Sequence, residues 1–219
     1  MLQIADALIN GSGLCRRLGE PRSGGRPEII HLAEEIITDT SAWPLRDFLD
    51  HDHPETCATS CYACIQQFQN RRYHGILDWR LGLAYLRAML QPNFTCGLDG
   101  EFDSFPELRG WQARARSLAE NVAAMRPTSL RAETVGPYHL PCIASIGQGG
   151  NILGRTVVVH PMWRMDRGAG LRFLGNLPGP QLHFVDTFDL ERRPLRALEM
   201  ALSREPSPDS QVAELTEAT

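Results

Sequence analysis

The chain has 219 residues and a net charge of −4, and all 22 of its basic side chains other than histidine are arginine. The absence of lysine excludes the P-loop of ATP-driven motors, the strand lysine of protein kinases and the Schiff-base lysine of pyridoxal phosphate enzymes. We therefore expect no self-contained ATP motor, and the composition, 42% hydrophobic and 22% charged, is typical of a globular protein without a strongly basic surface.

Helical patterns dominate the first part of the chain. Apolar spacing predicts helices over residues 1–9, 27–37 and 76–90, the second of which opens on Pro27. The Gly- and Pro-rich stretch 18–27 predicts a loop. Residues 1–91 are therefore expected to form a mostly helical module.

The pattern changes after residue 92. A long helix is predicted over 106–125 and a last one over 194–203, while β-branched and aromatic segments bounded by Gly and Pro predict strands. These strand segments are 140–146, 155–161 and 180–188. Residues 92–204 should thus form a mixed α/β region, which makes the fold class α+β. The acidic, arginine-free tail 205–219 is expected to be disordered.

The sequence predicts a cytoplasmic protein. No apolar run approaches the ~20 residues that span a bilayer, and the amino-terminal segment lacks the basic region of a signal peptide. In a reducing compartment, clustered cysteines indicate a metal site more than disulfides.

Three of the six cysteines form a C-x3-C-x2-C cluster at Cys57, Cys61 and Cys64. Thiolates at this spacing can share one tetrahedral ion, and structural zinc takes four ligands. The candidates for the fourth ligand are Cys15, His51, His53 and His74; we favour Cys15, with His53 second. The competing interpretation is a redox pair or a set of buried thiols, and buried thiols are what we expect of Cys96 and Cys142.

Two segments around this cluster, 10–18 and 56–86, resemble the MrfA-like zinc-binding (MZB) domain. That domain occurs in the C-terminal region of DEAD/DEAH-box superfamily 2 helicases and of related phage-defence proteins. Segments 155–163 and 184–194 are similar to the closing region of the same larger proteins. The matching residues are Asn10, Gly11, Gly13, Cys15, Cys57, Cys61, Cys64, Asn70, His74, Leu77, Asp78 and Arg80.

The resemblance implies a zinc-binding accessory module without catalytic activity of its own. Its partners would be a helicase motor domain or subunit, upstream or in trans, and DNA or RNA. Because the motor lobes precede the zinc module in the family, we expect the chain to be a fragment or a separate subunit. Some family members carry a cysteine where this chain has Glu55, which leaves the fourth ligand open.

Arg71 and Arg72 are the candidate nucleic-acid contacts, because arginine binds phosphate in a bidentate way. Solvated charge or an interdomain salt bridge explains them equally well. Tyr62, Phe68 and Tyr73 interleave with these arginines and could stack on bases, although such side chains in helices more often belong to the core. The pair Arg192-Arg193 is expected to be ordinary surface charge.

Three other polar residues have two possible roles. Asp78 is expected to cap the following helix rather than to orient His74 toward a metal. His160 and Asp186 motivate the alternative function, a metal-dependent nuclease or hydrolase with its site around them. Hydrogen bonding at strand ends is the favoured interpretation of both.

Overall fold

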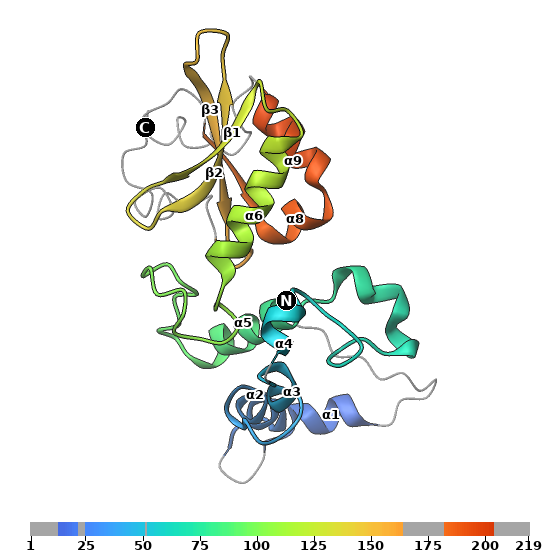
Figure 1. Ribbon diagram of the computed structural model, residues 1–219. Helices are drawn as coiled ribbons and strands as arrows, with labels where there is room; N and C mark the ends of the chain where they lie inside the picture. The colour runs from blue at the N-terminus through green and yellow to red at the C-terminus, as the bar shows by residue number, and fades with distance from the viewer. Residues whose placement is uncertain (1–12, 22–24, 51, 164–181, 204–219) are drawn as a thin grey trace. The chain divides into compact units, whose positions relative to one another are not determined.

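The computed structural model describes residues 13–21, 25–50, 52–163 and 182–203. It confirms the α+β class, with helices and one four-stranded sheet (Figure 1). The chain divides into two compact units, Met1–Phe94 and Thr95–Thr219, against a predicted boundary after residue 91. The predicted helix 1–9 and the predicted disordered tail lie outside the described residues.

The first unit contains helices α1 to α5 and a 3₁₀ helix, η1. Helix α2 forms where it was predicted, whereas α1 occupies the first residues of the stretch that we expected to be a loop. The elements are α1 (Leu14–Gly19), α2 (Glu28–Thr38), α3 (Leu45–Phe48), α4 (His53–Thr56), η1 (Phe68–Ile76) and α5 (Trp79–Leu90).

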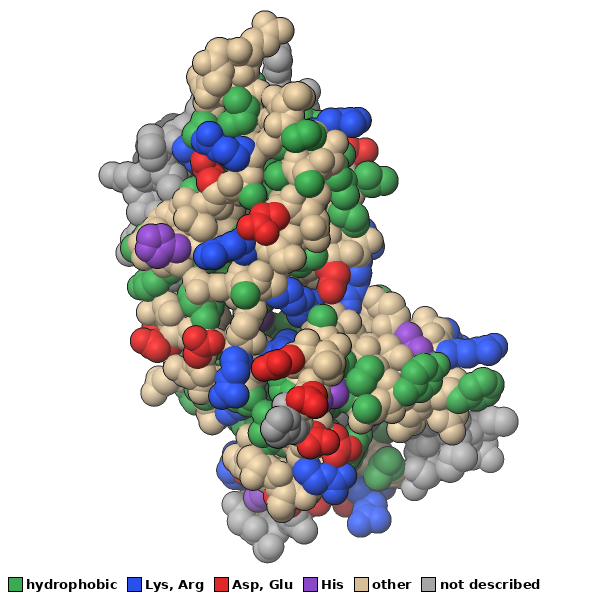
Figure 2. Space-filling view, in the orientation of Figure 1, with side chains coloured by type: hydrophobic (Ala, Val, Ile, Leu, Met, Phe, Trp, Pro, Cys, Tyr) green, Lys and Arg blue, Asp and Glu red, His purple; other side chains and the backbone are tan. Residues whose placement is uncertain are grey.

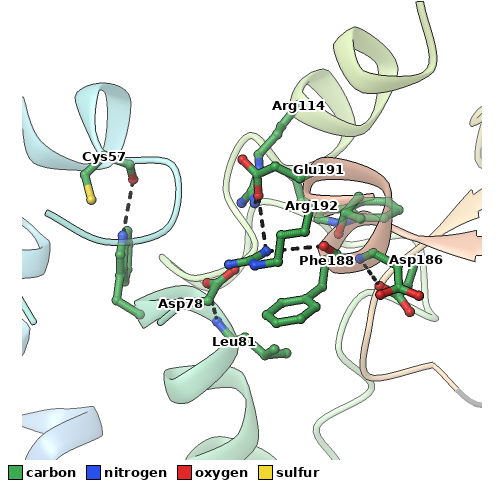
Figure 3. Close-up of polar contacts among 12 residues, drawn as sticks. Cys57, Asp78, Leu81, Arg114, Asp186, Phe188, Glu191 and Arg192 are labelled. Carbon is green, nitrogen blue, oxygen red and sulfur yellow. Dashed lines mark hydrogen bonds and ion pairs between the residues drawn. The ribbon is translucent and has the colours of Figure 1, made fainter. Parts of the chain in front are cut away.

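Helix α5 begins three residues later than predicted because Asp78 caps it. The Asp78 carboxylate accepts a hydrogen bond of 3.0 Å from the backbone N–H of Leu81, which satisfies one of the unpaired donors of the first turn (Figure 3). The capping interpretation of Asp78 is therefore confirmed. The core beside this helix contains two of the clustered cysteines; its buried members are Ile37, Leu45, Phe48, Cys57, Cys64, Trp79 and Leu83.

The second unit is built on a sheet of order β1-β2-β3-β4, in which only the β3–β4 pair is parallel. Its strands are β1 (Leu130–Val135), β2 (Leu140–Ile146), β3 (Ile152–Val159) and β4 (Leu182–Asp186). Strand β2 matches the prediction, and β1 was missed because its middle residues are polar or small. Strand β4 ends at Asp186, two residues early, because the Asp186 carboxylate accepts from Asp189 N (2.8 Å) and starts a helix.

The helices of this unit are α6 (Trp111–Ala124), α8 (Thr187–Arg192) and α9 (Pro194–Leu202), which lie together beside the sheet (Figure 1). Helix α6 begins at Trp111 rather than at residue 106, because Gly110 takes a left-handed backbone conformation (φ 73°) at the N-cap. Helix α9 matches its prediction. Among the described residues, no helix has the length and apolar character needed to cross a membrane.

Candidate metal centre

Four side chains of the first unit point their ligand atoms at one position. The donor atoms of His53, Cys57, Cys61 and Cys64 all lie within 4.8 Å of one another. The Cys61 sulfur is 3.5 Å from His53 Nε2 and 3.7 Å from the Cys64 sulfur, which is itself 3.9 Å from the Cys57 sulfur. Tetrahedral zinc, with Zn–S about 2.3 Å and Zn–N about 2.05 Å, needs S···S separations of about 3.8 Å and S···N of about 3.5 Å. The group could therefore hold a metal ion, and its spacing is compatible with Zn²⁺.

Local backbone structure brings these ligands together. The single turn α4 carries His53 and ends where the N–H of Cys57 donates to the His53 carbonyl (2.8 Å). Cys61 and Cys64 form a knuckle in which the Cys61 carbonyl accepts from the N–H groups of Cys64 and Gln66, both at 3.1 Å. The N–H of Cys61 also lies 3.1 Å from the Cys64 sulfur, and such a donor stabilises a thiolate.

A second contact of His53 fixes the imidazole for metal binding. Its Nδ1 lies 3.3 Å from the carbonyl oxygen of Phe48, which can only accept, so the contact is a hydrogen bond in the tautomer that carries its proton on Nδ1. The lone pair is then on Nε2, the atom that faces Cys61. A ligating histidine that donates its other N–H to a carbonyl is the usual arrangement around protein-bound metals.

The thiols of the cluster differ in how readily they lose a proton. Burial raises the pKa of the Cys57 thiol, and the hydrogen bond with Cys61 and the charge of Cys64 act in the same direction. Burial also acts to raise the pKa of Cys61, but the Ala63 N–H and hydrogen bonds with Cys57 and Cys64 lower it overall. Three thiolates cannot come together here unless a cation balances their negative charge. This requirement favours a metal ion as the species that the four side chains bind.

Helix α5 holds the ligand loop from its first turn. The indole N–H of Trp79 donates to the Cys57 carbonyl (3.2 Å), and the backbone N–H of Trp79 donates to the Thr59 carbonyl (2.9 Å). The Arg80 guanidinium donates to the carbonyl of Pro54. Two successive residues of α5 thus donate hydrogen bonds to three carbonyls of the ligand segment, and these bonds join the segment to the start of the helix.

The fourth donor atom of the candidate group comes from a different residue than the one that we favoured. Cys15 lies in α1 and is not in the group, whereas His53, our second choice, supplies the fourth donor atom. The reason is local: α4 places His53 one turn before Cys57. His51 lies outside the described residues. The His74 imidazole is engaged elsewhere, with Nε2 2.9 Å from Asn70 Oδ1 and 3.0 Å from the Gln67 carbonyl.

Three aromatic residues that we expected to be buried, Tyr62, Phe68 and Tyr73, are exposed. Exposed fractions are 72% for Tyr62, 76% for Phe68 and 45% for Tyr73. The guanidinium of Arg71 lies 5.2 Å from the Phe68 ring centre, and that of Arg72 lies 4.8 Å from the Tyr73 ring centre. Within the described parts of the chain, neither arginine forms an ion pair.

Arg192 and Arg193, expected to be ordinary surface charge, both make contacts, and the Arg192 side chain is largely buried. Arg192 lies 3.7 Å from the Phe188 ring centre and 3.5 Å from the Glu191 carboxylate (Figure 3). Arg193 lies 3.7 Å from the carboxylate of Asp189.

The alternative site does not form a metal centre in the described residues. Asp186 caps α8, and His160 is buried, with Nδ1 accepting from the Met162 N–H (3.2 Å) and lying 3.3 Å from the Cys96 sulfur. Burial lowers the pKa of His160 to about 4, so the imidazole is neutral at pH 7. The metal-binding group found among the described residues includes neither His160 nor Asp186, and both act as hydrogen-bonding groups.

No family model, curated protein or solved structure matches the chain, so the metal centre is interpreted from its own geometry.

Proposed function

We propose that this chain is a zinc-binding accessory module that works with a nucleic-acid motor, as the MZB domain does in superfamily 2 helicases. The observation that carries the proposal is the spacing of His53, Cys57, Cys61 and Cys64. Four protein ligands leave no open coordination position for a reacting water, and this is typical of structural rather than catalytic zinc. The ion would therefore fold the module, and binding would supply folding free energy.

The nucleic-acid part of the proposal depends on Arg71 and Arg72. Between Glu55 and Asp78 there is no acidic residue, and these two arginines are the only full charges. Both side chains are exposed, and among the described residues neither has a carboxylate partner. An unneutralised arginine pair on the surface suits phosphate contacts. The resemblance to helicase C-terminal regions supports a motor, in the same protein or in a separate subunit, as the partner.

Metal analysis of the full chain tests the zinc centre. Protein purified without chelator should contain about one zinc per chain, because closed four-ligand sites bind strongly. The variant His53→Ala should lose most of this zinc, and Cys15→Ser, the matched control, should retain it. Zinc below about half an equivalent in the wild type would refute the centre. Loss in Cys15→Ser with retention in His53→Ala would refute the ligand set.

Salt-dependent binding tests the arginines. For the double variant Arg71→Gln/Arg72→Gln, the slope of log K against log salt for an oligonucleotide should shrink by about 1.4, since each neutralised phosphate of a single strand contributes about 0.7. Arg116→Gln, which removes an exposed arginine from α6, is the control and should leave the slope nearly unchanged. An unchanged slope in the double variant would contradict the assigned contacts.

A further inference from the structure

Three exposed rings and two arginines lie on residues 62–73, a segment that begins within the Cys61–Cys64 knuckle and continues into η1. Tyr62 lies within the Cys61–Cys64 knuckle, while Phe68 and Tyr73 lie on η1 with the arginines. Figure 2 shows basic and hydrophobic side chains beside one another at the edge of the molecule where Figure 1 places the teal segment between α4 and α5. Large exposed apolar side chains next to one another mark interaction sites more often than solvated surface.

Hydrogen bonds hold this segment in one conformation. The Asn70 amide group donates to the Ile65 carbonyl (2.9 Å), and its oxygen accepts from the Gln67 N–H (2.8 Å). The same oxygen lies 2.9 Å from His74 Nε2, and the His74 ring meets the Tyr62 ring edge-on at 5.4 Å. The knuckle and η1 are thus joined through one asparagine and one histidine. Rings that are already positioned lose little conformational entropy when they bind a ligand.

We propose that Tyr62, Phe68, Arg71, Arg72 and Tyr73 form a stacking surface for single-stranded nucleic acid. The inference rests on the nucleic-acid role proposed above and narrows it to unpaired strands. Exposed rings stack on unpaired bases whatever the sequence, whereas the bases of a duplex are already stacked on one another. The guanidinium groups lie beside two of the rings and can contact the phosphates that connect those bases.

Charge identifies a polyanion rather than an apolar protein surface as the ligand. The segment between Glu55 and Asp78 carries two arginines and no acid, and rings interleaved with cations match the alternating bases and phosphates of a strand. Each contact is sequence-tolerant, so the surface should bind oligothymidylate and oligouridylate alike.

Fluorescence anisotropy with the full, zinc-loaded chain tests the surface. The probes are oligothymidylate and oligouridylate of roughly 20 nucleotides, longer than common single-strand site sizes, and a hairpin duplex with the same number of phosphates. Phe68→Ala and Tyr73→Ala should each weaken single-strand binding by roughly 5- to 150-fold and leave duplex binding unchanged. Tyr73→Phe, which keeps the ring, should bind as the wild type does.

Two controls test whether weaker binding comes from the loss of stacking, rather than from misfolding or from the loss of any exposed aromatic ring. Zinc content must remain at the wild-type value in every variant, and Trp43→Ala removes a ring that is 58% exposed outside this surface and should not change binding. Equal single-strand binding by Phe68→Ala, Tyr73→Ala and the wild type would overturn the stacking surface. If the arginine variants still weaken binding in that case, the proposed function stands; if the wild type binds neither strand nor duplex, both proposals fail.

Equal binding of the two single strands supports the stacking surface, and binding of only one of them contradicts its expected tolerance of sequence. Duplex binding as tight as single-strand binding contradicts the inference.

Discussion

Replacement of Trp79 by phenylalanine isolates the contact between α5 and the metal loop. The substitution keeps an aromatic ring in the core but removes the indole N–H that donates to the Cys57 carbonyl at 3.2 Å. Trp79 is only 2% exposed, and its ring stacks on Phe48 with centres 5.0 Å apart. The Cys57 carbonyl is therefore shielded from bulk water in the folded protein.

The cost follows from leaving a buried acceptor without its partner. A buried carbonyl that loses its hydrogen bond destabilises the folded state by about 1–3 kcal/mol. Because Cys57 is a proposed ligand, this cost should appear in metal binding, and 1.4 kcal/mol is tenfold in an equilibrium constant. We expect zinc affinity to fall by about 5- to 150-fold in Trp79→Phe.

Competition against a colorimetric zinc chelator measures this affinity at constant pH. Trp111→Phe is the matched control, since the Trp111 indole N–H also makes one buried hydrogen bond, to Thr187 Oγ1 at 3.2 Å, but in the second unit. That variant should unfold more easily and keep its zinc affinity. An unchanged affinity in Trp79→Phe, or an equal loss in both variants, would refute the coupling between α5 and the loop.

Three further predictions concern the thiols, a buried histidine and a helix cap. In the zinc-loaded protein, a thiol reagent at about pH 8 should modify Cys15 alone, and removal of zinc by a chelator should expose Cys57, Cys61 and Cys64 to the reagent. Cys96 and Cys142 should react only after denaturation, because burial raises the pKa of each of these two thiols to about 12. Mass spectrometry counts the labels, and early labelling of Cys61 in zinc-loaded protein would argue against coordination. The second unit should lose stability as the pH falls from 6.5 toward 4, because burial lowers the pKa of His160 from 6.5 to about 4 and only the unfolded state takes up a proton in that window. The loss of unfolding free energy should approach about 3 kcal/mol. Denaturant unfolding at several pH values measures it, and the variant His160→Asn should show a flatter dependence of unfolding free energy on pH. A dependence as steep as that of the wild type would contradict this prediction. Asp78→Ala should lower the unfolding free energy of the first unit by about 1 kcal/mol through loss of the cap of α5; Asp78→Asn keeps an acceptor oxygen and should recover most of it, and equal losses in the two would point to a role for charge instead.

Periodic apolar segments were predictable because burial alone decides their structure. The strand Leu140–Ile146 is buried over most of its length, and its β-branched, bounded pattern located it correctly. The start of α6 was not predictable, because Pro106 suits a first helical turn but Gly110 takes the left-handed conformation that begins the helix. The polar middle of β1 gave no strand signal, and its strand structure comes from antiparallel pairing with β2, the next strand along the chain.

The candidate metal-binding group contains the three clustered cysteines that the sequence suggested, but its fourth donor comes from His53 rather than from Cys15. Cys15 lies 42 positions before Cys57 and His53 lies four positions before it, so closing the site through His53 costs about 2 kcal/mol less chain entropy. That difference favours the local histidine. Residue type alone favoured a fourth thiolate, and the one-turn helix that presents His53 was too short to show a periodic pattern.

The exposure of the aromatic residues also escaped prediction. Tyr62, Phe68 and Tyr73 have the residue types of a core, but η1 is a 3₁₀ helix whose described residues include none that is buried. The neighbouring arginines could have indicated that this segment is exposed, because Arg71 and Arg72 cannot enter a core without partners.

All four donor atoms come from twelve successive positions, 53 to 64. Loops of about ten residues close within roughly 10–100 ns, far faster than a ribosome adds about 5–20 residues per second. Once position 64 has emerged during synthesis, this stretch can capture an ion before Trp79 emerges in its turn. The order of assembly is then ion first and α5 second, with the tryptophan docking on a loop that the metal has already shaped. If the group binds zinc as proposed, zinc supply would act at the start of folding of this unit, as the step that prepares the surface on which the helix packs.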